Sequence, residues 1–234
     1  PYNMRADAAR ALGVPIERVQ TKMAGLNHLS FVTEVLLDGE PVLQRLIDEG
    51  KLNMQLMANV PAADGAGALL STLRLAPSPY LQYYYYEAEM LAHEKEEAET
   101  VGTRGQQILA TQEELFALYR DPALAEKPKL LEKRGGAYYS TVAAMLMEAL
   151  ISPEEREMTL CCRNGGALPE LESDAVVEVN ALVSRNGVTP LPAGKLPQAV
   201  RGLVQCVKAY ESMTVAASVE GSRMKAVQAL MHHP

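Results

Sequence analysis

Residues 25–40 read GLNHLSFVTEVLLDGE, and the second half of this stretch has the pattern of a β-strand. Alternate side chains fall on one face of that strand: Phe31, Thr33, Val35 and Leu37. Asp38-Gly39 then gives a turn signal. His28 stands at the entrance of the apolar run. A lone histidine in such a place is more often a structural residue than a ligand, so spacing alone favours a structural role for His28.

The rest of the chain is mainly helical in its pattern. Expected helices cover residues 1–13, 41–50, 80–99, 106–120, 137–150, 197–220 and 223–232. Further strands are expected over 157–164 and 174–191, with Asn186-Gly187 as a hairpin turn, and a loop over 59–68. These patterns predict one helix-rich α+β domain over residues 1–234, with its strands in two clusters.

Composition restricts the class of protein. The 234 residues are 48% hydrophobic and 22% charged, as in an ordinary soluble protein. No apolar run reaches the ~20 residues of a membrane-spanning helix, and no signal peptide is recognisable. A net charge of -7 argues against a nucleic-acid partner. Three cysteines give no disulfide framework, which makes a cytoplasmic location the default. Because helix-like sequence begins almost at Pro1, we expect the chain to be the later part of a longer polypeptide.

Most familiar site motifs are missing from the sequence. No G-x-G-x-x-G follows a strand, so the chain by itself is not expected to be a dinucleotide-binding Rossmann unit. It also contains no G-x-S-x-G, H-E-x-x-H or Cys-x-x-Cys. We interpret Cys161 and Cys162 as buried thiols rather than metal ligands.

Residues 77–90, PSPYLQYYYYEAEM, have the most unusual composition in the chain, with five of its ten tyrosines. Tyrosines at helical spacing usually face a core or a subunit interface. Tyr80 differs because it directly follows Pro79, which suits the first turn of a helix. A phenol acts as a general base only if a nearby cation lowers its pKa from ~10.

Arg104 lies in the stretch AETVGTRGQQ, after an acidic run, and is expected to open the next helix. It has two readings, a surface arginine that neutralises the run or a planar cation that binds a phosphate or sugar oxygen. The basic pair Lys133-Arg134, before a double glycine, is similarly ambiguous.

Seven motifs occur in order: GLNHL, PYLQYYY, TR, EKRGGAYYS, NGGALPEL, DAVVEV and KAYE. In this order the sequence resembles glycoside hydrolase family 4, and within it the 6-phospho-β-glucosidases, from Pro1 to Pro234. The resemblance implies a fold with an N-terminal Rossmann domain and a C-terminal domain similar to those of lactate and malate dehydrogenases. This chain corresponds to the C-terminal part, and the Rossmann domain is absent from it.

The resemblance also implies roles for single residues. His28 matches the histidine ligand of a divalent metal, usually manganese. Tyr80 matches the tyrosine that takes a proton from C2 of the sugar, and Arg104 matches a substrate-binding arginine. The second metal ligand would be a cysteine in a C-N-V-P motif just upstream of Pro1. Cys161, Cys162 and Cys206 match no such position, and no NAD-binding residue is assigned in this chain.

The implied activity is NAD- and metal-dependent cleavage of 6-phospho-β-glucosides, including phosphorylated disaccharides, by hydride abstraction at C3, deprotonation at C2 and elimination. Family members form homodimers and homotetramers. The sequence departs from the family pattern at Arg163-Asn164-Gly165 and at Gly105, which leaves the sugar and the aglycone open. The alternatives are the C-terminal domain of a 2-hydroxy acid dehydrogenase, with His28 in proton transfer, and a non-catalytic oligomerisation fragment.

Overall fold

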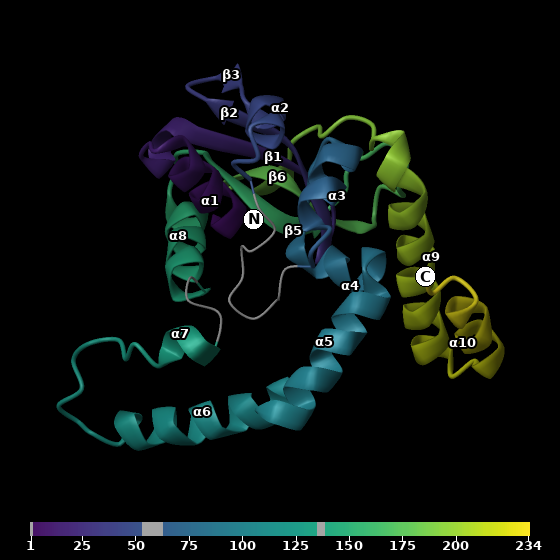
Figure 1. The fold of residues 1–234 in the computed structure, drawn as a ribbon. Helices are drawn as coiled ribbons and strands as arrows, with labels where there is room; N and C mark the ends of the chain where they lie inside the picture. The colour runs from purple at the N-terminus through teal and green to yellow at the C-terminus, as the bar shows by residue number, and fades with distance from the viewer. Residues whose placement is uncertain (1, 53–62, 135–138) are drawn as a thin grey trace.

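A computed structural model describes residues 2–52, 63–134 and 139–234, and Figure 1 shows how they are arranged. Within these ranges the chain is helix-rich and forms two small antiparallel sheets, which confirms the predicted α+β class. The α-helices are α1 (Tyr2–Leu12), α2 (Leu43–Asp48), α3 (Ala66–Leu73), α4 (Gln82–Tyr85), α5 (Glu87–Thr100), α6 (Arg104–Tyr119), α7 (Leu131–Arg134), α8 (Tyr139–Ile151), α9 (Gln198–Glu220) and α10 (Arg223–Leu230). Short 3-10 helices are η1 (Ile16–Arg18) and η2 (Pro79–Leu81).

The first sheet is built on a hairpin. Its strands are β1 (Val19–Leu26), β2 (Leu29–Leu37), β3 (Glu40–Pro41) and β4 (Ala76–Pro77). Leu26 pairs with Leu29, so Asn27 and His28 form a two-residue turn, and a bulge at Lys22/Met23 shifts the register of the hairpin. β3 pairs with the end of β2, and β4 pairs with its beginning.

The second sheet has the order β5, β6, β7, with β6 in the middle. Its strands are β5 (Arg156–Arg163), β6 (Val176–Ser184) and β7 (Gly187–Pro190). β6 and β7 join through a two-residue turn at Arg185-Asn186, one residue earlier than the predicted Asn186-Gly187, because Ser184 pairs with Gly187; Gly187 opens β7 with a φ of +111°. β6 also packs against β1, so the two sheets meet along these strands.

Two groups of buried apolar side chains hold these elements together. In the first group, α1 and α2 cover the β1–β2 hairpin through Ala8, Val19, Val35 and Leu46. The second group joins the tip of the same hairpin to β6, α9 and the segment before α4. Its members include Leu26, Phe31, Leu81, Val179 and Val200. Because the hairpin contributes to both groups, its turn is held from two sides.

Helices α5 and α6 extend from the sheets as a long arm along the lower part of Figure 1, in teal. α6 begins with a capping box in which Thr103 accepts from the Gln106 N–H and Gln106 accepts from the Thr103 N–H. Of the residues of α6, Leu115 is buried. No helix of the described ranges is long and apolar enough to cross a membrane.

Several predicted elements need correction. The expected loop over 59–68 is wrong at its end, because α3 begins at Ala66, while residues 59–62 lie outside the described ranges. The expected helix over 80–99 is interrupted at Tyr86, whose φ of -127° separates α4 from α5. The face of β2 that carries Phe31, Thr33, Val35 and Leu37 is not uniformly buried, since Thr33 and Leu37 are half-buried, while Val32 on the opposite face is buried. Cys161 is exposed and Cys162 is half-buried, so the prediction of buried thiols is wrong.

Candidate functional site

His28 occupies the tip of the β1–β2 hairpin, where the backbone must reverse within two residues. Its φ of +65° lies in the left-handed region, which non-glycine residues seldom adopt, although histidine does so more often than most. The imidazole is exposed. Among the described residues it has a stacking partner but no hydrogen-bond partner, so its nitrogens are open to a ligand.

Tyr80 is that stacking partner. The two ring centroids lie 4.2 Å apart with an interplanar angle of 19°. The sheet explains why the two segments meet: β2 and β4 are antiparallel with Phe31 opposite Pro77, and the Ser78 N–H donates to the Ser30 carbonyl at 2.8 Å, which places the His28 turn beside the segment that carries Tyr80. Backbone pairing therefore brings together two residues that are distant in the sequence.

The segment that carries Tyr80 is firmly anchored. Pro79 and Leu81 on either side are buried, while Tyr80 itself is half-buried. The buried Gln82 side chain accepts from the Ala63 N–H at 2.7 Å and donates to the Pro79 carbonyl at 3.2 Å. The phenol of Tyr80 thus has a fixed ring position at the edge of the protein surface.

The neighbouring tyrosines are engaged elsewhere. Tyr83 donates a hydrogen bond to Glu94 Oε1 at 3.1 Å, and burial together with the Glu94 carboxylate raises the pKa of Tyr83 to about 12. Tyr86 donates to the Gly65 carbonyl at 2.5 Å. Burial raises the pKa of Tyr85. Among the tyrosines of residues 80–86, Tyr80 is therefore the one whose ring lies against His28.

Arg104 lies apart from this pair. It is the first residue of α6, and its Nη2 donates to the Lys133 carbonyl at 3.1 Å. Within the described residues no hydrogen bond or ring contact joins Arg104 to His28 or Tyr80, and Figure 1 shows α6 on the arm, away from the hairpin. The structure thus brings together two of the three predicted site residues.

The metal-binding capacity of the described residues is limited. Across 2–52, 63–134 and 139–234 no cluster of three or more His, Cys, Asp or Glu side chains could hold a metal ion. His28, exposed and with open ring nitrogens, is suited to give one ligand to an ion whose other ligands come from elsewhere. Among the described residues, His28 therefore fits one position of a metal site that needs further ligands.

Cys161 lies beside the turn without acting as a reactive thiol. Asn27 Nδ2 donates to its Sγ at 3.5 Å. Although Cys161 as a whole is exposed, neighbouring protein atoms partly desolvate its sulfur, which raises the pKa of the thiol, and the Asn27 hydrogen bond opposes this effect. Because a thiolate is the form that binds metals, this environment disfavours Cys161 as a metal ligand.

Two further polar residues next to the turn were not predicted from the sequence. Ser30 Oγ donates to the carboxyl of Glu178 in β6, and both side chains are buried. The available signal was a glutamate inside an apolar strand, VVEVNALV, because buried acidic residues are rare unless they are paired.

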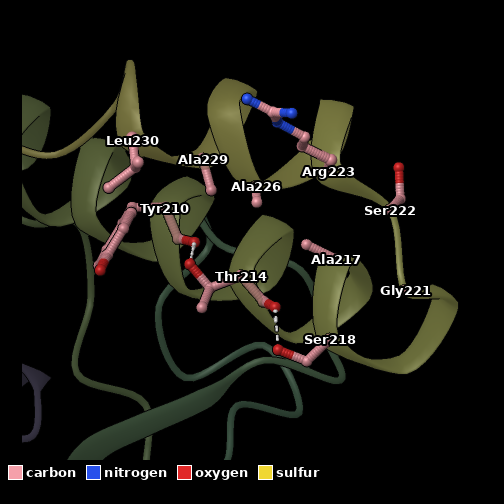
Figure 2. Close-up of a pocket in the computed structure, with 10 residues that line it drawn as sticks. All are labelled: Tyr210, Thr214, Ala217, Ser218, Gly221, Ser222, Arg223, Ala226, Ala229 and Leu230. Atoms are coloured by element: carbon pink, nitrogen blue, oxygen red, sulfur yellow. Dashed lines mark hydrogen bonds between the residues drawn. The ribbon is translucent and has the colours of Figure 1, made fainter.

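A hollow of about 450 Å³ lies between α9 and α10 (Figure 2), and neither His28 nor Tyr80 lines it. Two of its hydroxyl groups bind the backbone, since Thr214 donates to the Tyr210 carbonyl at 2.7 Å and Ser218 to the Thr214 carbonyl at 2.9 Å. Nothing in its lining converges on a ligand, so the His28–Tyr80 pair is the better candidate site.

The fold and this pair agree with a family assignment. The sequence model of the family 4 glycosyl hydrolase C-terminal domain matches residues 23–234, so the chain belongs to this family. It is 38% identical over 100% of its length to a probable 6-phospho-beta-glucosidase of Bacillus subtilis (strain 168), of which it covers 53%. It is also 33% identical over 100% of its length to the 6-phospho-beta-glucosidase BglT of Thermotoga maritima, of which it covers 54%.

A solved structure supports the same family assignment. The 6-phospho-beta-glucosidase from Thermotoga maritima, with manganese, NAD⁺ and glucose-6-phosphate, superposes with a TM-score of 0.85 at 32% identity. The match covers 100% of this chain and 54% of that one. The chain thus spans about half the length of the relatives that it matches.

Proposed function

We propose that this chain is the C-terminal part, folded as one domain, of an NAD- and divalent-metal-dependent 6-phospho-β-glucosidase. The stacked His28–Tyr80 pair in a family 4 domain is the observation that carries the proposal. The relatives support the substrate class and the cofactors, because the Thermotoga maritima structure contains manganese, NAD⁺ and glucose-6-phosphate. The absent half would supply the nucleotide site and the other metal ligands.

In this proposal His28 gives one imidazole nitrogen to the divalent metal and Tyr80 receives the proton of C2. When bound, NAD⁺ supplies reversible hydride transfer at C3 and the metal supplies positive charge beside the C2 and C3 oxygens. Tyr80 suits the base role because its ring is stacked on the His28 ring, so its phenol lies close to any cation held there. Such a cation favours the phenolate form.

Arg104 is proposed to contact the substrate. A guanidinium has five N–H donors, and one of them binds the Lys133 carbonyl, which leaves others for a phosphate or sugar oxygen. This role requires the α6 arm and the hairpin turn to meet the same substrate molecule. We further propose a cytoplasmic homodimer or homotetramer, which sedimentation and cell fractionation would test.

The test is an assay of the full-length enzyme with a chromogenic 6-phospho-β-glucoside. Omission of manganese, NAD⁺ or reductant should each abolish turnover. Tyr80→Phe should slow exchange of the C2 proton by about 10²-fold or more, because it removes the proton acceptor. Tyr84→Phe is the matched control, since Tyr84 is an exposed tyrosine two residues before the break in the helix, and should exchange normally.

Two outcomes would contradict the proposal. Normal C2 exchange in Tyr80→Phe would remove the base role from this residue. Metal-independent oxidation of 2-hydroxy acids by the full-length enzyme would favour a dehydrogenase instead.

A further inference from the structure

Glu178 is placed where an acidic side chain is costly. It is the third residue of β6, is 6% exposed, and has the apolar residues Val177 and Val179 as its neighbours in the strand. Burial of a carboxyl group is unfavourable unless hydrogen bonds compensate for lost hydration. An apolar residue would fill this strand position at a lower cost, so packing alone does not account for the glutamate.

The partner of Glu178 is the hydroxyl group of Ser30, which is 2% exposed. Ser30 is also bonded through its backbone, because its carbonyl accepts from the Ser78 N–H at 2.8 Å. It follows His28 by two residues, and Ser78 precedes Tyr80 by two residues. Ser30 is therefore the point at which β6, the His28 turn and the Tyr80 segment are joined.

Asn180 makes a second connection from the same strand. Residues two apart in a strand project to the same side, so Glu178 and Asn180 both face the hairpin. Asn180 Nδ2 donates to the Thr21 carbonyl at 2.7 Å, and Asn180 Oδ1 accepts from the Met23 N–H at 2.8 Å, at the bulge of β1. One strand thus holds the hairpin near its bulge and near its turn.

We propose that Glu178, acting through Ser30, is a positioning residue that fixes the His28 turn against Tyr80 for metal binding and proton transfer. The inference rests on the proposed function, since it assigns Glu178 to the same reaction. Loss of the Ser30–Glu178 hydrogen bond would free the turn to shift relative to Tyr80. Groups that orient a metal ligand commonly change metal affinity when they are removed.

The test compares four variants of the full-length enzyme, three single and one double. Ser30→Ala and Glu178→Ala should each weaken Mn²⁺ binding about 10-fold, as measured by electron paramagnetic resonance in the presence of NAD⁺. Their kcat should fall while the KM for the phosphoglucoside stays nearly constant. Glu178→Gln keeps an oxygen that accepts from Ser30, so it should stay close to the unaltered enzyme. The Ser30→Ala/Glu178→Ala double variant should be no worse than either single variant.

Ser184→Ala is the matched control. Like Ser30 in β2, Ser184 is a buried serine, and it is the last residue of β6; its hydroxyl oxygen accepts from the Asn186 N–H at 3.3 Å, in the turn that follows the strand. This variant should retain normal Mn²⁺ affinity and kcat. An equal loss in Ser184→Ala would overturn the positioning role, as would normal Mn²⁺ affinity in Ser30→Ala.

A failure of the proposed function can be distinguished from a failure of the positioning role. An unaltered enzyme that binds Mn²⁺ but cleaves no phosphoglucoside would refute that function, and the Mn²⁺ affinities of the variants would still decide the positioning role. If the unaltered enzyme also fails to bind Mn²⁺, the positioning role is tested by amide hydrogen exchange over residues 26–32. Faster exchange in Ser30→Ala than in Ser184→Ala supports the inference, and equal exchange overturns it.

Discussion

Asp7 in α1 carries a charge that the fold compensates poorly. Its Oδ1 accepts from Arg10 at 2.6 Å, but its Oδ2 is buried and has no hydrogen-bond partner within the described residues. Burial raises the pKa of Asp7, and the Arg10 guanidinium opposes this without cancelling it. The pKa of Asp7 is therefore higher in the folded state than in the unfolded chain. As the pH rises from the unfolded-state pKa to the folded-state pKa, the folded state loses stability, and it does not regain this stability at higher pH.

Asp7→Asn should therefore raise the melting temperature at pH 7, since it removes the charge and keeps the shape of the side chain. The gain should disappear at a pH below the titration of Asp7, where both forms are neutral. Thermal unfolding followed by circular dichroism at several pH values measures the difference. Asp48→Asn is the control with the opposite sign, because the hydrogen bond from Arg74 lowers the pKa of Asp48. A melting temperature at pH 7 that is unchanged or lower in Asp7→Asn would refute this account.

At the same scale, the tyrosine cluster indicates how far single residues could be read from the sequence. Adjacent tyrosines look equivalent in PYLQYYYY, yet Tyr80 stacks on His28, Tyr83 binds Glu94 and Tyr86 binds Gly65. Periodicity could not separate them, because their partners lie on other elements. The resemblance to family 4 selected Tyr80 and His28, and their mutual contact agrees with that selection, while their chemical roles stay predictions.

Among the elements, the β1–β2 hairpin has the strictest local requirement. Gly25 has a φ of +146° and pairs with Ser30. A Cβ at Gly25 would overlap the Leu29 carbonyl oxygen and lie 2.7 Å from Ser30 Cα. Only glycine allows the two strands to approach this closely just before the turn.

Gly25→Ala should destabilise the protein by at least about 2 kcal/mol, because it adds a steric overlap to an unfavourable backbone conformation. Gly39→Ala, in the turn at the other end of β2, is the control. Gly39 has a φ of +89°, but a Cβ there meets no atom within 4 Å, so its cost should be about 1 kcal/mol. Urea unfolding gives both values, and equal losses would contradict the steric argument.

The elements differed in how well they could be predicted. Strong periodicity and turn residues located β2, β6, α9 and α10. β1 was missed because VQTKMAGL places polar residues among apolar ones, and its burial comes from β2 and β6 on either side. The interruption at Tyr86 was missed because its hydrogen bond to Gly65 arises from tertiary structure. The Ser30–Glu178 contact was equally invisible, since it joins residues 148 positions apart.

At the scale of the whole molecule, the described residues bring one histidine and one tyrosine together but contain no complete metal cluster. The chain also spans about half the length of its relatives. In the proposed enzyme, the substrate, nucleotide and metal sites would be shared between this domain and residues outside it.

We accordingly expect the 234-residue chain by itself to be catalytically inactive, even when circular dichroism shows that it is folded. The chromogenic 6-phospho-β-glucoside, with manganese, NAD⁺ and reductant, provides the assay. The full-length enzyme at the same molar concentration is the positive control. Measurable turnover by the chain alone would show that its own residues complete the site.

The left-handed backbone of His28 affects how mutations at this position can be interpreted. Alanine would remove the imidazole and, at the same time, strain the turn, so lost activity could not be attributed to either change. Asparagine and glycine tolerate a positive φ much better, and they would delete the nitrogen donor while preserving the path of the chain. A comparison of the three variants would thus separate the coordination chemistry of the ring from the geometry of the loop that presents it.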